Sequence, residues 1–446
     1  MTIHTMFAQL VVSLWFVVAT LAAPTEEAKG QIWAVLVAGS NTFDNYRHQA
    51  DVCHAYQIFH RHGIPDSNII VMMYDDIAHN AENPKKGVII NKPNGPNVYG
   101  PKKVPKDYTG DDVTPQNFVN VLTGNKSAMI GKGSGKVLKS GPNDHVFINF
   151  VDHGATGIIG FPNDVMYANE LIKALKTMHK KKMYKKLVFY MEACESGSMF
   201  DKILPPNINI FATTAANPEE SSYACYYDAT IGAYLGDEYS ISWMEDIDSE
   251  EHQKNMTSET LLKQYKNVVK RVQESHPSMY GQKALEKNKV IDYMGMSNKS
   301  FVDTNIMSGP FKDAVSSRDV ALRTLERKIE LTNDVEKIKT LSLKRDNLIK
   351  GRKSVDNLFS QMMEKLNRAE AIEEIRHPLN LEMMPCYKTV VDHFRSNCID
   401  ITKNTYALAH LYKFANLCVE KTSPDDVIKV ISEVCTEQHK SMVGIN

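Results

Sequence analysis

The sequence predicts an α/β fold: a three-layer α/β/α domain with a mostly parallel sheet, followed by a separate all-α domain. Two apolar runs typical of buried strands, within 145–154 and 185–197, each end abruptly in polar residues. Between them, residues 167–182 carry apolar side chains at helical spacing, which indicates a strand–helix–strand unit. Beyond about residue 305, strand-like runs vanish and charged, helix-periodic sequence takes over from Arg318.

Further elements of the first part are expected in chain order. They are strands at 31–38, 69–74 and 207–213, a helix that carries Val52, Tyr56 and Phe59 on one face, a helix from Pro115, and a helix at 257–275. Asp112 or Thr114 is expected to cap the helix that starts at Pro115. Residues 83–110, rich in Pro, Gly, Asn and Lys, predict a long surface loop.

In the second part, the helical pattern is expected to break near Gly351 and Pro378. Residues 423–426, Ser-Pro-Asp-Asp, are expected to cap a last helix that carries Ile428, Ile431 and Cys435. This region is therefore predicted to be a domain of its own, and a partner-binding module is one interpretation of it.

Length, charge and the first residues bound the class of protein. A chain of 446 residues has room for two or three domains, and a net charge of -1 gives no reason to expect nucleic acid or an anionic membrane as partner. Residues 1–23, with an apolar core from 10 to 22, predict a secretory signal peptide, and 24–30 a short propeptide. No other run is long enough for a membrane span.

The seven cysteines divide into two groups. Cys386, Cys398, Cys418 and Cys435 cluster in the last quarter, which predicts two disulfides in an oxidising compartment, with three pairings open. Cys53 and Cys225 fall in apolar surroundings and are expected to be inert core thiols. Cys194 is then the odd, reactive cysteine.

Cys194 and His153 follow two neighbouring parallel strands, whose carboxyl ends meet at one edge of the sheet. A thiol becomes a strong nucleophile when an imidazole stands close by. The amides of Gly154 and Cys194 could jointly face an oxyanion. The pattern indicates a cysteine hydrolase; the alternative is a buried thiol and a structural histidine at two strand ends.

Three separated motifs resemble the legumain family of asparaginyl endopeptidases, which are cysteine peptidases with a caspase-like fold. The motifs are Asn-Tyr-Arg-His-Gln-Ala-Asp at 45–51, Val-Asp-His-Gly-Ala-Thr-Gly at 151–157 and Glu-Ala-Cys-Glu-Ser-Gly-Ser-Met at 192–199. The resemblance implies a peptidase domain at 31–304, a linker or activation peptide at 305–345 and a helical prodomain at 346–446. It further implies a zymogen that its own prodomain inhibits, cystatin-type inhibitors as partners, and a lysosomal, acidic or secreted location.

By the same resemblance, Cys194 is the nucleophile, His153 the general base and acid, and Asn45 the group that orients the imidazole. Asp152 is the residue that such enzymes can convert to a succinimide, a feature linked to peptide ligation. The implied specificity pocket consists of Arg47, His48, Glu192, Ser222 and Asp237. A side-chain amide needs a cation beside its oxygen and carboxylates beside its nitrogen, so this set suits asparagine, and aspartate only when protonated.

Other implied features lie further along the chain. The family pairs Cys386 with Cys418 and Cys398 with Cys435. Acid self-activation is expected at Asn333, with Asn305 and Asn347 as alternatives, and Ala409 stands where relatives are expected to have an arginine that helps to dock the prodomain. Asn125, Asn255 and Asn298 precede x-Ser/Thr and are candidates for glycosylation. No cofactor is expected, and neither EF-hand nor His-Glu-x-x-His spacing is present, so no metal site is predicted.

Two other functions compete with this interpretation. A GPI-anchor transamidase subunit would be expected to end in a membrane helix, whereas this sequence ends in a cysteine-rich helical region. An inactive binding relative would not need the intact trio of Cys194, His153 and Asn45.

Overall fold

The computed structural model describes residues 30–446 apart from 101–102, 253–254, 298–308 and 369–375. The predicted signal peptide and Asn298 therefore lie outside the described residues. A six-stranded sheet forms the centre of the first part, in the order β11-β8-β7-β3-β1-β2. Its strands are β1 (Ile32–Ala38), β2 (Ile69–Met72), β3 (His145–Val151), β7 (Lys186–Glu192), β8 (Ile210–Thr214) and β11 (Ser278–Gly281). All neighbours are parallel except the edge strand β11, which confirms the predicted mostly parallel sheet.

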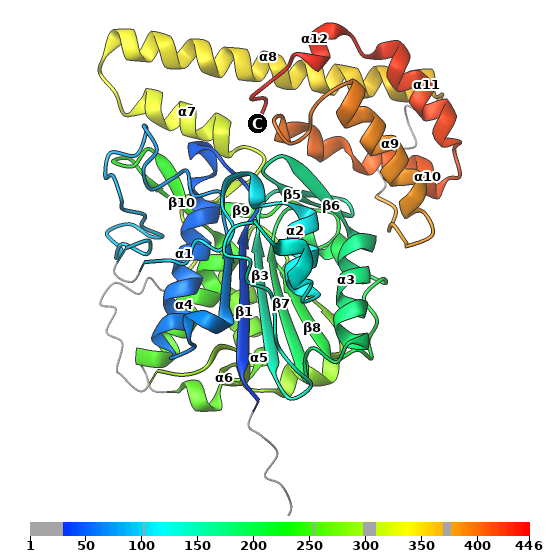
Figure 1. Cartoon of the computed structure of the whole chain (residues 1–446). Helices are drawn as coiled ribbons and strands as arrows, with labels where there is room; N and C mark the ends of the chain where they lie inside the picture. Colours follow the sequence, from blue (N-terminus) through cyan, green and yellow to red (C-terminus); the bar gives the residue numbers. More distant parts are fainter. Residues whose placement is uncertain (1–29, 101–102, 253–254, 298–308, 369–375) are drawn as a thin grey trace, which may run out of the picture.

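Helices cover both faces of this sheet (Figure 1). One face packs on α1 (Tyr46–Arg61), α4 (Glu238–His252) and α5 (Leu261–Arg271), and the other on α2 (Pro115–Leu122) and α3 (Ala168–Lys180). Alternate β1 residues supply the two cores: Leu36 lies in the first and Val37 in the second. Thr114 is the cap of α2, since its hydroxyl accepts from the Asn117 amide at 3.1 Å. The three-layer arrangement is thus confirmed.

In the first part, two small sheets, the edge strand β11 and two helices were not predicted. One sheet, β4 (Gly154–Ala155), β5 (Ile158–Phe161) and β6 (Asp164–Tyr167), is inserted between β3 and α3. The other joins β9 (Tyr223–Asp228) and β10 (Ala233–Asp237) to β12 (Val315–Ser316). These strands are short and gain their partners from elsewhere in the chain, so local periodicity is too weak to reveal them. Helix α4 was not predicted either, because its sequence is acidic and was not interpreted as helical. A short helix α6 (Ile291–Met294) completes this part.

The second part is all-helical and lies across the carboxyl edge of the large sheet (Figure 1). Its helices are α7 (Val320–Glu330), α8 (Val335–Lys365), α9 (Met384–Asn397), α10 (Tyr412–Val419), α11 (Pro424–Val434) and α12 (Glu437–Lys440). Two disulfides staple it, Cys386–Cys418 and Cys398–Cys435, with Cα–Cα distances of 5.9 and 5.3 Å. The pairing implied by the family resemblance is confirmed.

Some expectations for this part were wrong. Helix α8 runs through Gly351 without a break, so the predicted boundary at 345/346 falls inside a helix. A Cβ at Gly351 would lie 2.2 Å from the Ile445 side chain, so this glycine serves close packing rather than termination. Helix α11 is not the last helix, because α12 follows it, and Ser423 makes no side-chain capping hydrogen bond.

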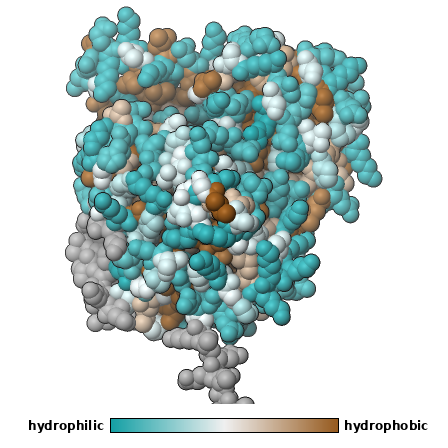
Figure 2. Space-filling view, viewed as in Figure 1, coloured by the Kyte–Doolittle hydropathy of each residue, from teal (hydrophilic) through white to brown (hydrophobic). Residues whose placement is uncertain are grey.

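The two parts share one continuous apolar core. It includes Tyr167 and Leu171 of the first part together with Tyr387 and Phe394 of α9. Elsewhere the surface is mainly hydrophilic with scattered apolar side chains, as Figure 2 shows for one face. Within the described ranges, no helix is long and apolar enough to cross a membrane.

Candidate active site

The ends of β3 and β7 bring the two predicted reactive residues together. These strands are in register at Val151 and Glu192, and the Asp152 amide donates to the Glu192 carbonyl at 3.0 Å. His153 and Cys194 then follow at equivalent places on neighbouring strands. A Cβ at Gly154 would lie 2.3 Å from the Cys194 carbonyl oxygen, so only glycine allows this approach. The two amides predicted to face an oxyanion thus belong to backbone segments in contact.

His153 is held by Asn45, whose Oδ1 lies 2.8 Å from His153 Nε2. The Asn45 Nδ2 group donates to the Asn41 carbonyl at 2.9 Å, which leaves Oδ1 to accept the Nε2 proton. Burial holds the pKa of His153 well below its usual range, and Arg47 and Arg318 add to this effect. The imidazole is therefore neutral, and its buried Nδ1 has no hydrogen-bond partner among the described residues. It can accept a proton.

Cys194 is fully buried between the two parts of the chain. Its Sγ lies 3.7 Å from Ser222 Oγ. Burial raises the pKa of the Cys194 thiol, while Arg318 lowers it. The residue that follows, Glu195, has a left-handed backbone with φ 47°, and the chain then enters a short 3-10 helix at Ser196–Met199. The sharp turn after β7 thus places the thiol at the sheet edge.

A group of buried charged residues, the pocket cluster (Arg47, Asp51, Glu192 and Asp237), comes from α1 and from the ends of β7 and β10. Arg47 Nε donates to Asp237 Oδ1 at 2.9 Å, and Glu192 Oε2 accepts from the amide and hydroxyl of Ser240 at 2.9 and 3.0 Å. Burial and the Asp237 charge raise the pKa of Glu192 well above its usual range. Acidic groups therefore outnumber the single cation of this pocket.

Three atoms of the pocket cluster have no hydrogen-bond partner among the described residues. They are Arg47 Nη2, Glu192 Oε1 and Asp237 Oδ2, and their side chains are at most about 1% exposed. Buried polar groups are normally paired, since an unmet one costs roughly 1–3 kcal/mol. One free cationic donor and two free carboxylate oxygens form the complement of a side-chain amide.

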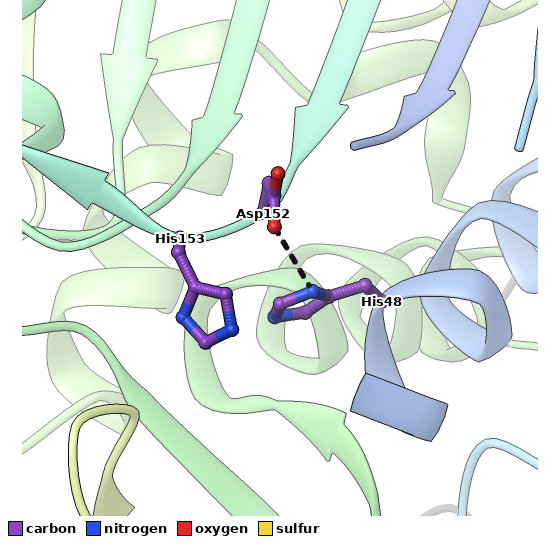
Figure 3. A group of neighbouring side chains, drawn as sticks. All are labelled: His48, Asp152 and His153. Atoms are coloured by element: carbon purple, nitrogen blue, oxygen red, sulfur yellow. Dashed lines mark ion pairs between the residues drawn. The ribbon is translucent and has the colours of Figure 1, made fainter. Parts of the chain in front are cut away.

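His48 and Asp152 lie next to His153 and complete a small convergent group (Figure 3). His48 Nδ1 is 3.5 Å from Asp152 Oδ1 and 2.6 Å from Ser40 Oγ. Burial raises the pKa of Asp152 to about 8, and Gly39 leaves room for this carboxyl, because a Cβ there would lie 2.4 Å from it. Ligand atoms of His48, Asp152 and His153 lie within 4.8 Å of one another, so the group could hold a metal ion, although the sequence indicated none.

Sequence reasoning missed two sets of residues at this site. The first is Asp51, which accepts from Asn91 Nδ2 at 2.7 Å and from the Asp237 amide at 3.3 Å. Asp51 follows Arg47 by one helical turn in the first motif, and this spacing could have indicated that the two side chains lie on one helix face. The second set is the latch cluster (Glu195, Arg318 and Arg376).

The latch cluster joins the peptidase side of the cleft to the helical side. Arg318 Nη2 donates to Glu195 Oε2 at 2.7 Å, and Arg376 Nη1 to Glu195 Oε1 at 3.3 Å. Burial raises the pKa of Glu195, and both arginines oppose this effect. No local pattern marks these arginines, because both reach the site from beyond residue 305.

The remaining predicted residues are scattered over the molecule. Asn125 and Asn255 are exposed, as glycosylation requires. Asn333 is exposed in the turn between α7 and α8, Asn347 is exposed within α8, and Asn305 lies outside the described residues. Cys53 and Cys225 are buried, and burial raises the pKa of both thiols, as inert core cysteines require.

Comparison with known proteins places the chain among peptidases. Residues 32–296 match the peptidase C13 family and residues 336–435 match the legumain prodomain. Mouse legumain (Mus musculus) is 49% identical over 418 residues, which cover 93% of this chain and 94% of the mouse protein. Human legumain (Homo sapiens) is 48% identical, covering 93% and 95%. The vacuolar-processing enzyme delta-isozyme of Arabidopsis thaliana is 42% identical, covering 92% and 91%.

A solved structure of caspase-1 from Spodoptera frugiperda also matches, with a TM-score of 0.35 and 10% identity over 61% of this chain and 93% of that chain. The two matching regions follow each other along the chain as the peptidase and helical parts do. Identity of nearly one half extends over almost the whole length of the mammalian relatives. The chain therefore belongs to the peptidase C13 family of cysteine endopeptidases and carries a legumain prodomain after its peptidase domain.

Proposed function

We propose that Cys194 attacks the scissile carbonyl and that His153 accepts its proton through Nδ1. Asn45 orients the imidazole through the 2.8 Å contact with Nε2. His153 then returns the proton to the leaving amine, and the amides of Gly154 and Cys194 stabilise the oxyanion. The neutral imidazole with a free Nδ1 supports this assignment.

We further propose that the enzyme cleaves after asparagine. The three unpartnered atoms of the pocket cluster carry this proposal, because Arg47 can donate to the amide oxygen while Glu192 and Asp237 accept its two hydrogens. His48 and Ser222 lie against the same pocket. An ionised aspartate would be repelled by the carboxylates, so cleavage after aspartate is expected only in acid.

Asp152 is our candidate for the succinimide linked to peptide ligation. It precedes His153, whose amide nitrogen would close the five-membered ring, and its neutral carboxyl near pH 7 suits attack by an amide. This activity would accompany hydrolysis at the same site.

The chain is proposed to be a zymogen whose helical domain inhibits it. Strand β12 lies antiparallel to β9, with Ser316 opposite Tyr223, and the Ser317 amide donates to the Ser222 carbonyl at 2.9 Å beside Cys194. This segment takes the course of a substrate. The short Ser317 side chain leaves the three pocket atoms unpartnered, so it does not supply what asparagine would.

Release in acid is proposed to start at the rim of the interface. Three peptidase carboxylates pair there with basic residues of the helical region: Asp164 with Arg395 at 2.5 Å, Glu170 with Lys388 at 3.4 Å, and Glu82 with Lys328 at 3.7 Å. These three ion pairs link the two parts of the chain, and we propose that they hold the closed form and weaken in acid.

Glu195, the buried carboxyl of the latch cluster, does not contribute to this response. Because burial raises its pKa in the closed form, protonation of Glu195 does not favour opening. The acid response is therefore assigned to the rim pairs.

The cut that makes release permanent is proposed at Asn333–Asp334. This bond lies in an exposed turn, whereas Asn347 lies within α8, where a protease would have to unwind the helix. We place the enzyme in the secretory pathway, in an acidic vesicle or outside the cell, because two disulfides and acid release suit those compartments. Cystatin-type inhibitors are proposed as partners on the family resemblance alone.

One experiment tests the central proposal. Purified chain is incubated at pH about 4 and then assayed with matched peptides that contain Asn, Asp or Gln before the bond, with and without a thiol-blocking reagent. We expect cleavage after Asn that the reagent abolishes. No cleavage of any peptide after release of the C-terminal fragment would favour an inactive relative instead.

A further inference from the structure

Residues 315–318, the cleft segment, show which parts of the enzyme would contact each residue of a bound peptide. Val315 and Ser316 pair with Ala224 and Tyr223 of β9. Ser317 then reaches Ser222, with 3.2 Å between the two hydroxyl oxygens, and Ser222 Oγ lies 3.7 Å from Cys194 Sγ. Ser317 thus occupies the place of the residue before the scissile bond.

Arg318 therefore occupies the place of the residue after the scissile bond, on the leaving-group side of Cys194. Its Nη2 donates to the Gly154 carbonyl at 2.7 Å and to Glu195 Oε2 at 2.7 Å. The side chains of Arg318 and Glu195 are 8% and 4% exposed. Gly154 and Glu195 belong to the peptidase domain and stay when the helical region leaves, so the acceptors for a guanidinium stay too.

We propose that Glu195 and the Gly154 carbonyl form a subsite that selects arginine directly after the scissile bond. This proposal rests on the proposed cleavage after asparagine and extends it to the leaving-group side. A carboxylate with a carbonyl beside it accepts two hydrogen bonds from the guanidinium of a substrate arginine. A substrate glutamine of similar length carries no positive charge, so it binds there less well. Lysine is expected to be second best, because its ammonium is a single point donor.

Substrate binding removes the cations that pair with Glu195 in the closed form. Arg318 belongs to residues 315–318, which a substrate must displace to reach Cys194. Arg376, the second partner of Glu195, belongs to the helical region and departs with it. Arg47 is committed to Asp237 at 2.9 Å. With both arginines gone, Glu195 has lost the two ion pairs of the closed form, which favours a basic residue of the substrate.

The test uses acid-activated enzyme at about pH 5.5, above the range where an exposed glutamate protonates. Four quenched peptides differ only in the residue after Asn: Arg, Lys, Gln or Glu. We expect kcat/KM for Arg to exceed that for Gln by about fivefold, the size of a partly exposed ion pair, and Glu to be poorest. In Glu195→Gln the Arg advantage should disappear.

Glu274→Gln is the matched control, because Glu274 is an exposed glutamate whose charge raises the pKa of Tyr223. It should keep the ratio of Arg to Gln. A second measurement does not depend on cleavage: a peptide of residues 314–320 should inhibit about fivefold better than the same peptide with glutamine in place of Arg318. Equal rates for Arg and Gln with intact cleavage after Asn would overturn the subsite alone, whereas no cleavage of any Asn peptide would overturn the proposed function.

Discussion

The pocket cluster, which includes Glu192 just before Cys194, and the latch cluster, which includes Glu195 just after it, have opposite charge ratios. Arg47 is the single arginine among three carboxyl groups in the pocket cluster, whereas Glu195 is the single carboxyl between two arginines in the latch cluster. The pocket is built from α1, β7 and β10 of the peptidase domain. The latch draws its arginines from the cleft segment and the helical part of the chain.

The difference shows what is permanent at this site and what can be removed. Three buried atoms of the pocket cluster lack a hydrogen-bond partner among the described residues, while Glu195 already has its partners. When the helical part leaves and a substrate displaces residues 315–318, the cleft loses the two arginines of the latch cluster and keeps all its carboxyl groups. A site with excess carboxyl groups is most stable where they are protonated, so the separated peptidase should favour acid.

The largest expected effect comes from removing the thiol between the two clusters. Cys194→Ser should reduce turnover by more than ~1,000-fold, because a hydroxyl is a poorer nucleophile in a site arranged for a thiolate. Both clusters should stay in place, so the fold and the thermal unfolding curve should change little. Appreciable cleavage by this variant, after contaminating proteases are excluded, would contradict the assignment.

The next effect separates the pocket from the latch. Glu192→Ala or Asp237→Ala should leave amide hydrogens unmet at roughly 1–3 kcal/mol each, a fall of about 5- to 150-fold in kcat/KM for Asn peptides. Asp237→Asn, which keeps the shape beside Arg47, shows whether lost activity is only lost folding. If either alanine variant cleaves after Asn as well as the parent, that residue does not line the pocket.

Removing an arginine of the latch cluster should change the rate of activation but not the preference for asparagine. Arg318→Ala removes buried, charge-assisted hydrogen bonds to Glu195 and the Gly154 carbonyl. Residues 315–318 should then leave Cys194 more readily, so conversion should be about tenfold faster at a fixed pH. Arg323→Ala is the control, since Arg323 pairs only with Glu326 and Glu330 along α7. An unchanged rate of conversion, followed by gel electrophoresis, would show that the latch does not hold the closed form.

The contribution of Asp152 to the pH dependence of thermal stability can be tested by calorimetry. The pKa of Asp152 is raised to about 8, so its contribution to stability is fully present below pH ~4 and is lost as pH rises through about 8. The Tm of the activated enzyme should therefore fall between pH 6 and 8.5, and fall less in Asp152→Asn. A Tm that rises over this interval would contradict the sign.

The smallest effect is expected at the rim. Asp164→Asn breaks the ion pair with Arg395. The Asp164 side chain is half exposed and the Arg395 side chain one-fifth exposed, so conversion at neutral pH should accelerate by no more than about fivefold. Salt screens such an exposed pair, so the acceleration should shrink at high ionic strength. An acceleration that is unchanged at high salt would show that this ion pair does not hold the closed form.

Much of this site could be predicted because its chemistry is written in local patterns. Two apolar runs that end at His153 and Cys194 predicted adjacent parallel strands, and parallel pairing brings their ends together whatever the loops do. The cysteine spacing and the family motifs likewise led to both disulfides. Such features depend on short stretches of chain and on period, which a sequence shows directly.

Other features were decided only by the tertiary structure. Helix α8 passes through Gly351 because Ile445, far along the chain, fills the space above that glycine, and local propensity cannot report such a contact. Burial raises the pKa of Glu195 although two arginines touch it, because desolvation depends on all that surrounds the group. By itself, the sequence determined the five parallel strands of the large sheet, the neighbouring places of His153 and Cys194, and the class of chemistry. The tertiary structure decided which distant arginines meet Glu195 and what lies across the cleft, because those contacts join segments that no local pattern relates.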